Sequence, residues 1–80
     1  MSKDKPEIGD IWENMIGMKL YVLYSDDVTT SFYMKNKKIG KLIEYTVITR
    51  DFMGGFTYLG KSKVKLNEDL FELENERWLK

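Results

Sequence analysis

Alternating apolar and polar residues predict short β-strands along most of the chain. In residues 18–24 every second position is apolar or aromatic, and one face carries Met18, Leu20, Val22 and Tyr24. A period of two is typical of a strand that packs one face on a core. The same reasoning predicts five strands, at residues 8–13, 18–24, 28–35, 42–50 and 56–59, with an interruption of the last at Gly60.

Polar and glycine-containing segments separate these predicted strands. Residues 14–17 turn the chain after the first strand. Residues 25–27 (Ser-Asp-Asp) are a turn signal, because short oxygen side chains accept hydrogen bonds from nearby backbone amides. Residues 36–40 form the next loop, whose Asn and Gly can both adopt positive φ. The Gly54-Gly55 pair marks a further turn or bulge.

The two ends of the chain differ in pattern from the middle. Residues 1–7 are polar and contain the only proline, so we interpret them as a flexible arm. Residues 67–69 (Asn-Glu-Asp) resemble a helix N-cap with acidic residues in the first turn, which predicts a helical turn at 67–71. Residues 72–80 fit a helix or a strand, and both interpretations stay open.

Five short strands without a long helix between them predict a mainly β fold with antiparallel pairing. Alanine is absent, whereas the strand-favouring Tyr, Phe, Thr, Val and Ile are plentiful. A sheet of this size can hide its edges by curling. We therefore expect residues 8–80 to form one small SH3-like barrel of about five strands with a short C-terminal helical turn. An open meander covered by the C-terminal segment is the alternative.

Size and composition exclude several function classes. The 80-residue chain has no cysteine and no histidine, which removes thiol nucleophiles, imidazole bases and the usual zinc sites. The paired acids Asp26-Asp27 and the acids at 68, 69 and 72 lack the alternating spacing of a calcium loop. We therefore expect a non-enzymatic protein with no cofactor and no metal. The charged start predicts no signal peptide, and we expect a cytoplasmic protein without a membrane segment.

Four segments of the chain carry a resemblance to known proteins: Lys5 to Glu13 (KPEIGDIWE), Met18–Tyr24, 56–60 (FTYLG) and 69–72 (DLFE). The first resembles the opening, the second the second strand, and the last two the late segments of small phage and prophage SH3-like β-barrel proteins of unassigned function. The resemblance implies an SH3-like fold and a phage or prophage accessory protein. It carries over no catalytic residue.

The chain has more aromatic residues than one small core easily holds, which favours a protein-binding role. Trp12 has apolar neighbours and is expected in the core. Tyrosine and tryptophan are common at binding hot spots. The candidate protein-binding residues are Tyr21, Tyr33, Tyr45, Tyr58 and Trp78. The partner would be a host or phage protein, or a second copy joined through a strand edge. Self-assembly into a structural component is a further alternative.

Charge is unevenly distributed although the whole chain is neutral. Residues 35–65 hold eight basic and two acidic side chains, a net +6. Clustered lysines gain affinity for nucleic acid by releasing its counterions, and nearby aromatic residues can stack on bases. An alternative function is therefore nucleic-acid binding through Lys35, Lys37, Lys38, Lys41, Lys61, Lys63 and Lys65. Equally, these lysines can simply keep strands and turns soluble.

Overall fold

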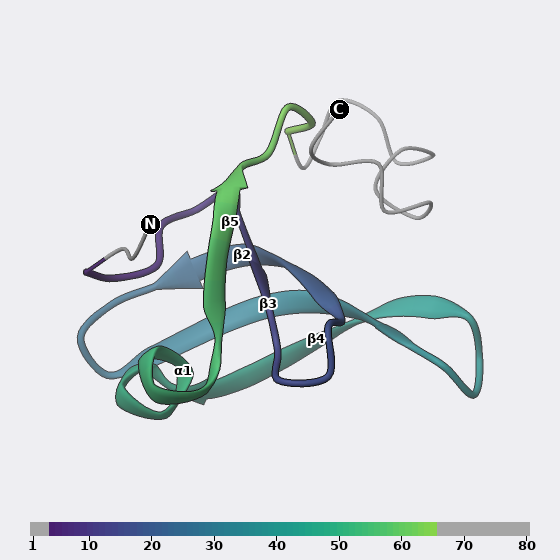
Figure 1. The fold of residues 1–80 in the computed structure, drawn as a ribbon, viewed down its shortest axis with the longest axis horizontal. Coiled ribbons are helices and arrows are strands. Elements are labelled where there is room, and N and C mark those ends of the chain that lie inside the picture. The colour runs from purple at the N-terminus through teal and green to yellow at the C-terminus, as the bar shows by residue number, and fades with distance from the viewer. Residues whose placement is uncertain (1–3, 66–80) are drawn as a thin grey trace.

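The computed structural model describes residues 4–65, which form one antiparallel five-stranded sheet and one short helix (Figure 1). The elements are β1 (Asp10–Glu13), β2 (Lys19–Ser25), β3 (Thr29–Asn36), β4 (Lys41–Ile48), α1 (Thr49–Gly55) and β5 (Thr57–Lys61). The sheet order is β4-β3-β2-β1-β5. The mainly β class and the antiparallel pairing predicted from the alternation are confirmed.

Two connections of different kinds build this sheet. Strands β2, β3 and β4 follow one another as hairpins, with Tyr21 opposite Tyr33 and Phe32 opposite Tyr45. The chain then passes through α1, and β5 returns to pair with β1 at the far side of the sheet. Among the described strands, β4 and β5 are therefore the two edges. Closure of the sheet into a barrel stays a prediction.

Several strand boundaries differ from those predicted. The first strand begins at Asp10 rather than Ile8, because Gly9 has φ +86° and the Asp10 amide closes a turn on the Glu7 carbonyl. The fourth strand ends at Ile48 rather than Arg50, because α1 begins at Thr49. The fifth strand runs through Gly60 to Lys61, and the pairing with β1 shifts register opposite this glycine.

The core lies between one face of the sheet and α1. Its buried members are Trp12, Leu20, Val22, Phe32 and Phe52. The Trp12 and Phe52 rings meet edge to face with centroids 5.0 Å apart, and Phe32 lies 5.6 Å from Phe52. Such geometry is favourable for aromatic pairs beyond the area that they bury. The prediction that Trp12 belongs to the core is confirmed.

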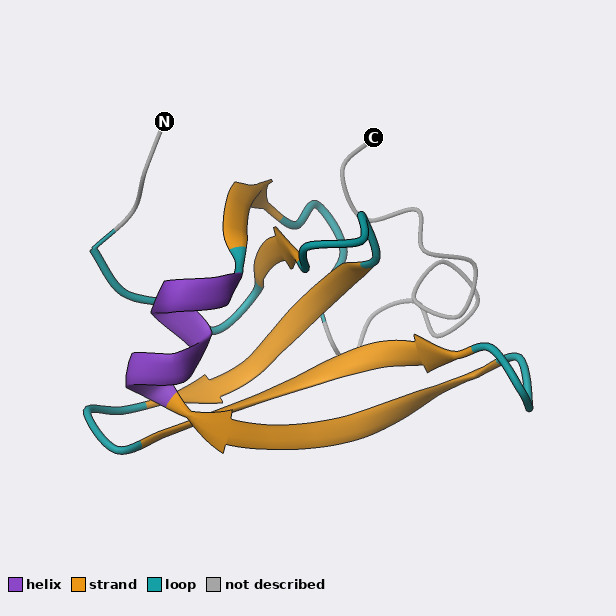
Figure 2. Cartoon of the chain, turned by 60° about the horizontal axis from the view of Figure 1, so that its bottom comes forward, coloured by secondary structure: helices purple, strands orange, loops and turns teal. Residues whose placement is uncertain are grey.

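Helix α1 is the element that the sequence pattern missed. Its seven residues, Thr49–Gly55, include two glycines and only one buried side chain, Phe52. Figure 2 shows the helix beyond the end of β4, where it turns the chain towards β5. Gly54-Gly55 therefore ends a helix and does not form a bulge. A seven-residue helix has too few turns to show a clear apolar period, so tertiary packing of Phe52 supports it.

Some expectations concern residues that the structure does not describe. The helical turn at 67–71, the open interpretation of residues 72–80 and the position of Trp78 all lie outside the described residues. The flexibility of residues 1–7 stays a prediction, as does the single domain of residues 8–80. Within that arm, Pro6 is buried.

Candidate functional site

Strand β4 is the most accessible long strand of the sheet. It has eight residues and pairs along its full length with β3 on one side only. None of its eight side chains is buried, whereas β2 has three buried side chains and β3 has two. One hydrogen-bonding edge of β4 therefore faces away from the sheet. The strand is nevertheless apolar, with Leu42, Ile43, Tyr45, Val47 and Ile48 among its residues.

The register assigns the residues of β4 to the two faces of the sheet. Ile43, Tyr45 and Val47 lie opposite core-face residues of β3, and the Tyr45 ring stacks on Phe32 with centroids 5.8 Å apart. The side chains at 42, 44, 46 and 48 lie on the other face, because successive residues of a strand alternate. Helix α1 contacts β3 and β4. Since Phe52 joins the core, α1 packs on the core face and not on the outer face.

The outer face of the sheet carries a second apolar cluster. Ile11 and Tyr21 are buried there, and the half-buried Leu23, Tyr33, Leu42 and Val64 pack against them. The Tyr21 hydroxyl donates a 3.0 Å hydrogen bond to the Val64 carbonyl. The chain after β5 is thereby held against this face. Both faces of the sheet thus use aromatic residues structurally.

The structure divides the predicted protein-binding tyrosines between the two faces of the sheet. Tyr21 is only 3% exposed and therefore does not fit a contact residue. Tyr33 is half-buried beside it on the outer face. Tyr45 and Tyr58 are half-buried on the core face, where Tyr58 lies 5.5 Å from Trp12. The surplus of aromatic residues is thus largely absorbed by two clusters.

Sequence reasoning missed a group of exposed apolar side chains near the end of β4. Tyr24, Val28 and Ile48 are 50%, 66% and 52% exposed. Ile48 lies opposite Thr29, and the Thr49 amide donates to the Val28 carbonyl, so Ile48 and Val28 belong to one end of the sheet. Only the strand order and the exposures identify this group, since the same residues read as ordinary strand positions in the sequence.

Asp26 holds the turn between β2 and β3 together. Its carboxylate accepts hydrogen bonds of 2.8 Å from the backbone amides of Val28 and Thr29 and one of 2.7 Å from the Tyr24 hydroxyl. These bonds, the one from Thr29 foremost, lower the pKa of Asp26. The same carboxylate raises the pKa of Tyr24, because it accepts the tyrosine proton in a hydrogen bond. The turn signal at 25–27 thus has the predicted physical basis.

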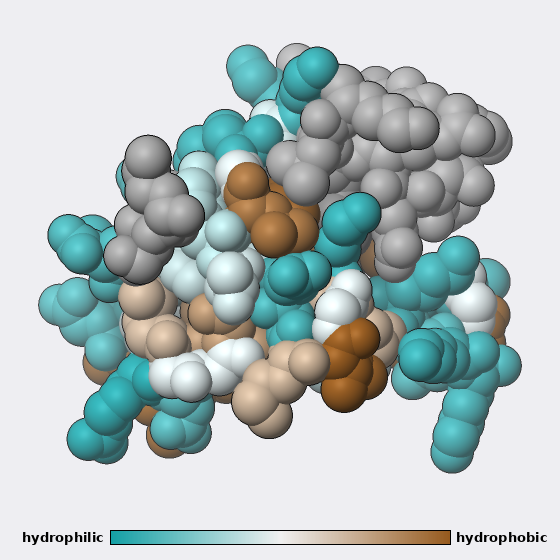
Figure 3. Space-filling view, viewed as in Figure 1, coloured by the Kyte–Doolittle hydropathy of each residue, from teal (hydrophilic) through white to brown (hydrophobic). Residues whose placement is uncertain are grey.

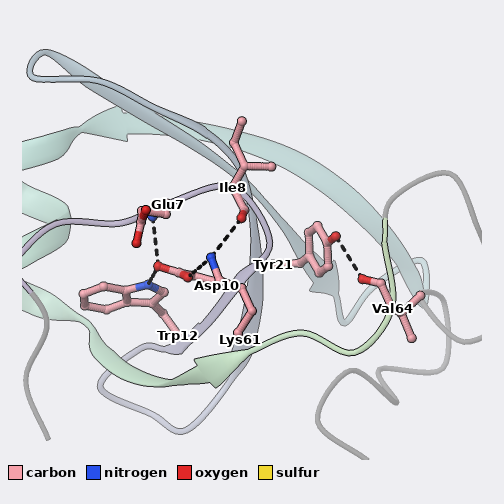
Figure 4. Close-up of polar contacts among 7 residues, drawn as sticks. All are labelled: Glu7, Ile8, Asp10, Trp12, Tyr21, Lys61 and Val64. Atoms are coloured by element: carbon pink, nitrogen blue, oxygen red, sulfur yellow. Dashed lines mark hydrogen bonds and ion pairs between the residues drawn. The ribbon is translucent and has the colours of Figure 1, made fainter.

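A buried carboxylate anchors the start of β1 (Figure 4). Asp10 is fully buried, and the Lys61 ammonium lies 2.9 Å from one of its oxygens. The other oxygen accepts hydrogen bonds from the Glu7 amide at 2.8 Å and from the Trp12 indole at 3.3 Å. Lys61 also donates to the Ile8 carbonyl at 3.2 Å. This arrangement fastens β5 and the N-terminal segment to β1, so we interpret it as structural.

Two shallow pockets lie on the described surface. One of about 370 Å³ is lined by residues 5–8 and 25–27 and by Lys61, with charged side chains of both signs. The other, of about 270 Å³, is lined by residues 17–19, Lys35 and Lys37. The described residues contain no group of three or more His, Cys, Asp or Glu side chains that could hold a metal.

The structure divides the predicted nucleic-acid-binding lysines into two groups. Lys35, Lys37, Lys38 and Lys41 lie at the β3–β4 hairpin, where Figure 3 shows a mostly hydrophilic end of the molecule. Lys61 lies opposite Asp10, at the other end of the β1–β5 pair, and Lys63 and Lys65 follow it. Lys19 belongs to the hairpin group as well, because it lines the smaller pocket together with Lys35 and Lys37. The basic stretch is therefore not one continuous row along the sheet.

Comparison with known proteins identifies no similar protein. No family model, curated protein or solved structure matches the chain. Across residues 4–65, no helix is both long and apolar enough to cross a membrane.

Proposed function

We propose that this protein is a non-enzymatic protein-binding module that engages its partner at the outer edge of β4, with which no strand of residues 4–65 pairs. The observation that carries the proposal is the eight-residue apolar edge strand in which no side chain is buried. In keeping with the resemblance of its strand segments to phage SH3-like proteins, we propose an accessory role in which the partner is a host or phage protein or a second copy of this chain.

The physics of sheet edges supports this role. An edge strand presents unpaired backbone N–H and C=O groups, and natural proteins usually protect such edges with charges, prolines or bulges. In β4 the charged residues are Lys41, at its beginning, and Glu44, and the pairing with β3 is regular over eight residues. Addition of a partner strand to such an edge gives affinity through backbone hydrogen bonds and specificity through alternate side chains.

The proposal is tested by capture from bacterial lysate with matched variants. The tagged full chain is immobilised, and retained proteins are compared for wild type, Ile48→Lys and Ile16→Lys, each with and without nuclease. Ile48 lies on β4 and Ile16 in the β1–β2 turn, and both are well exposed, at 52% and 74%. Both variants thus add the same charge at the same residue type. Circular dichroism checks that each still folds.

We expect nuclease-resistant capture that Ile48→Lys reduces at least tenfold and Ile16→Lys leaves unchanged. A lysine at the edge places a charge where the partner strand would lie, which disfavours addition. Loss of capture with Ile16→Lys alone would move the binding surface to the β1–β2 turn and contradict the proposal. Equal capture by all three proteins would also contradict it.

Nucleic-acid binding is the second candidate, favoured by one observation. Lys19, Lys35 and Lys37 line a common pocket at the hairpin end, and Lys38 and Lys41 lie nearby in the chain. If this group binds phosphates, retention disappears with nuclease and weakens steeply with salt. The substitutions Lys35→Gln and Lys37→Gln would then make the retention of nucleic acid less dependent on salt, whereas Ile48→Lys would have no effect on it.

A further inference from the structure

We infer that the partner at the β4 edge is a second copy of this chain, paired antiparallel with β4 about a two-fold axis at Tyr45. The inference rests on the proposed use of this edge and names its occupant. A two-fold axis perpendicular to the sheet brings identical edges together and keeps the core face beside the core face. The two sheets would then continue as one.

The side chains of β4 are self-complementary in this register. Directly opposed residues in an antiparallel pair share a face and interact most strongly. With Tyr45 opposite its own copy, Ile43 faces Val47 and Leu42 faces Ile48 of the second chain. Glu44 faces Thr46, whose hydroxyl can donate to the carboxylate. Each apolar residue from 42 to 48 therefore lies opposite another apolar residue, and no like charges are directly opposed.

The neighbouring registers that preserve the faces are less favourable. Shifting the register by two residues in one direction places Glu44 opposite Glu44 of the second chain, so that two like charges are directly opposed. A shift in the other direction places Glu44 opposite Ile48 and Ile43 opposite Thr49, the first residue of α1. Shifting the register by a single residue would place core-face side chains of one chain opposite outer-face side chains of the other. The two-fold register at Tyr45 is therefore preferred.

The rest of the described fold leaves room for this pairing. Strand β4 pairs with β3 along its other edge, and α1 contacts β3 and β4 from the core face. Seven residues of each chain, 42–48, would pair before α1 begins. A single strand pair buries less than the roughly 1,600 Å² of a standard interface. We therefore expect a dimer whose population rises with protein concentration.

The first test is the mass of the full chain in solution. Sedimentation equilibrium over a wide range of protein concentrations is measured for wild type, Ile48→Lys and Ile16→Lys. We expect the mass to double with concentration for wild type and Ile16→Lys, and Ile48→Lys to weaken dimerisation at least tenfold. A monomer at all concentrations would overturn the inference, as would a dimer that Ile48→Lys leaves intact.

The second test fixes the register by disulfide formation. The chain has no cysteine, so Glu44→Cys and Thr46→Cys each introduce one thiol at an exposed outer-face position of β4. Opposed residues bring their Cβ atoms within disulfide reach, whereas diagonal neighbours are too far apart. Oxidation of the mixture should give mainly the 44–46 disulfide between chains, identified by its mass. A dominant 44–44 or 46–46 disulfide would overturn this register.

The two proposals can fail separately. Capture that is sensitive to Ile48→Lys from a chain that stays monomeric would support the binding module and reject the second copy as occupant. A dimer that Ile48→Lys weakens, with no other protein retained, would support the second copy and reject the host or phage partner.

Discussion

At the residue scale, single buried or well-bonded side chains fix the ends of the strands. Asp10 fastens β1 to β5 through Lys61 and accepts the Trp12 indole N–H, so the polar anchor touches the edge of the core. Asp26 plays the corresponding part in the β2–β3 turn by accepting two backbone amides. Hydrogen bonds to an ionised acceptor are stronger than those between neutral groups, which explains why carboxylates occupy both positions.

The lowered pKa of Asp26 makes part of the stability depend on pH. A carboxyl group whose pKa is lower in the folded state stabilises the fold above its unfolded pKa, and this contribution disappears as pH falls through the folded pKa. Asp26→Asn keeps an acceptor oxygen but cannot ionise. We expect its unfolding free energy to fall less steeply below about pH 4 than that of wild type. Urea denaturation from pH 6 to pH 2 measures this.

Asp27→Asn is the matched control for that measurement. It removes the same charge from the adjacent exposed residue, whereas the bonds from Val28 and Thr29 go to Asp26. We expect Asp27→Asn to keep the wild-type acid dependence. If both variants flatten it equally, net charge rather than the Asp26 hydrogen bonds is the cause.

At the scale of elements, turn geometry decides where each strand begins and ends. The β1–β2 turn closes with the Asn14 amide donating to the Met18 carbonyl, and Gly17 adopts φ +85°. This φ is costly for any residue with a Cβ. Gly54 differs, since it lies in α1, has no positive φ, and an added Cβ there would meet no atom within 4 Å.

The two glycines should therefore respond to alanine in opposite directions. Gly17→Ala should destabilise the protein by about 1–2 kcal/mol, because the side chain strains a left-handed backbone. Gly54→Ala should stabilise it by up to about 1 kcal/mol, because alanine loses less conformational entropy in a helix. Thermal and urea unfolding measure both. Destabilisation by Gly54→Ala would show that the end of α1 needs glycine for another reason.

At the scale of the whole molecule, one phenylalanine joins the sheet to its helix. Phe52 is fully buried and its ring contacts those of Trp12 on β1, Phe32 on β3 and Phe56. The meander β2–β4 and the β1–β5 pair thus meet on one residue of α1.

Truncation of this residue should weaken the entire fold. Phe52→Ala should reduce the unfolding free energy by about 3–5 kcal/mol, through lost burial and the cavity left behind. That is a large fraction of the roughly 5–15 kcal/mol typical of a domain. Ile39→Ala, at a side chain that is 57% exposed, should change it by less than about 0.5 kcal/mol. Similar effects of the two variants in urea denaturation would contradict the central role of Phe52.

The sequence by itself determined the strands and two of the turns of the described region. Alternation predicted five strands, and their positions agree with β1 to β5 to within a few residues, because a half-buried strand must alternate. Turn chemistry at 25–27 and 36–40 was also predictable, since Asp26 accepts hydrogen bonds from nearby backbone amides and Gly40 adopts φ +68°. Trp12 was recognisable as core from its apolar neighbours.

Only the tertiary structure decided which strands are edges, which aromatic residues are free and where α1 lies. The apolar pattern of β4 resembles that of an internal strand, and its place at the edge follows from the return of β5 to β1. Tyr21 and Tyr45 both lie in strands with alternating apolar residues. Tyr21 is nevertheless buried against Val64, whereas Tyr45 stacks on Phe32. Local pattern reports that a residue has an apolar side chain, whereas long-range pairing determines what covers it.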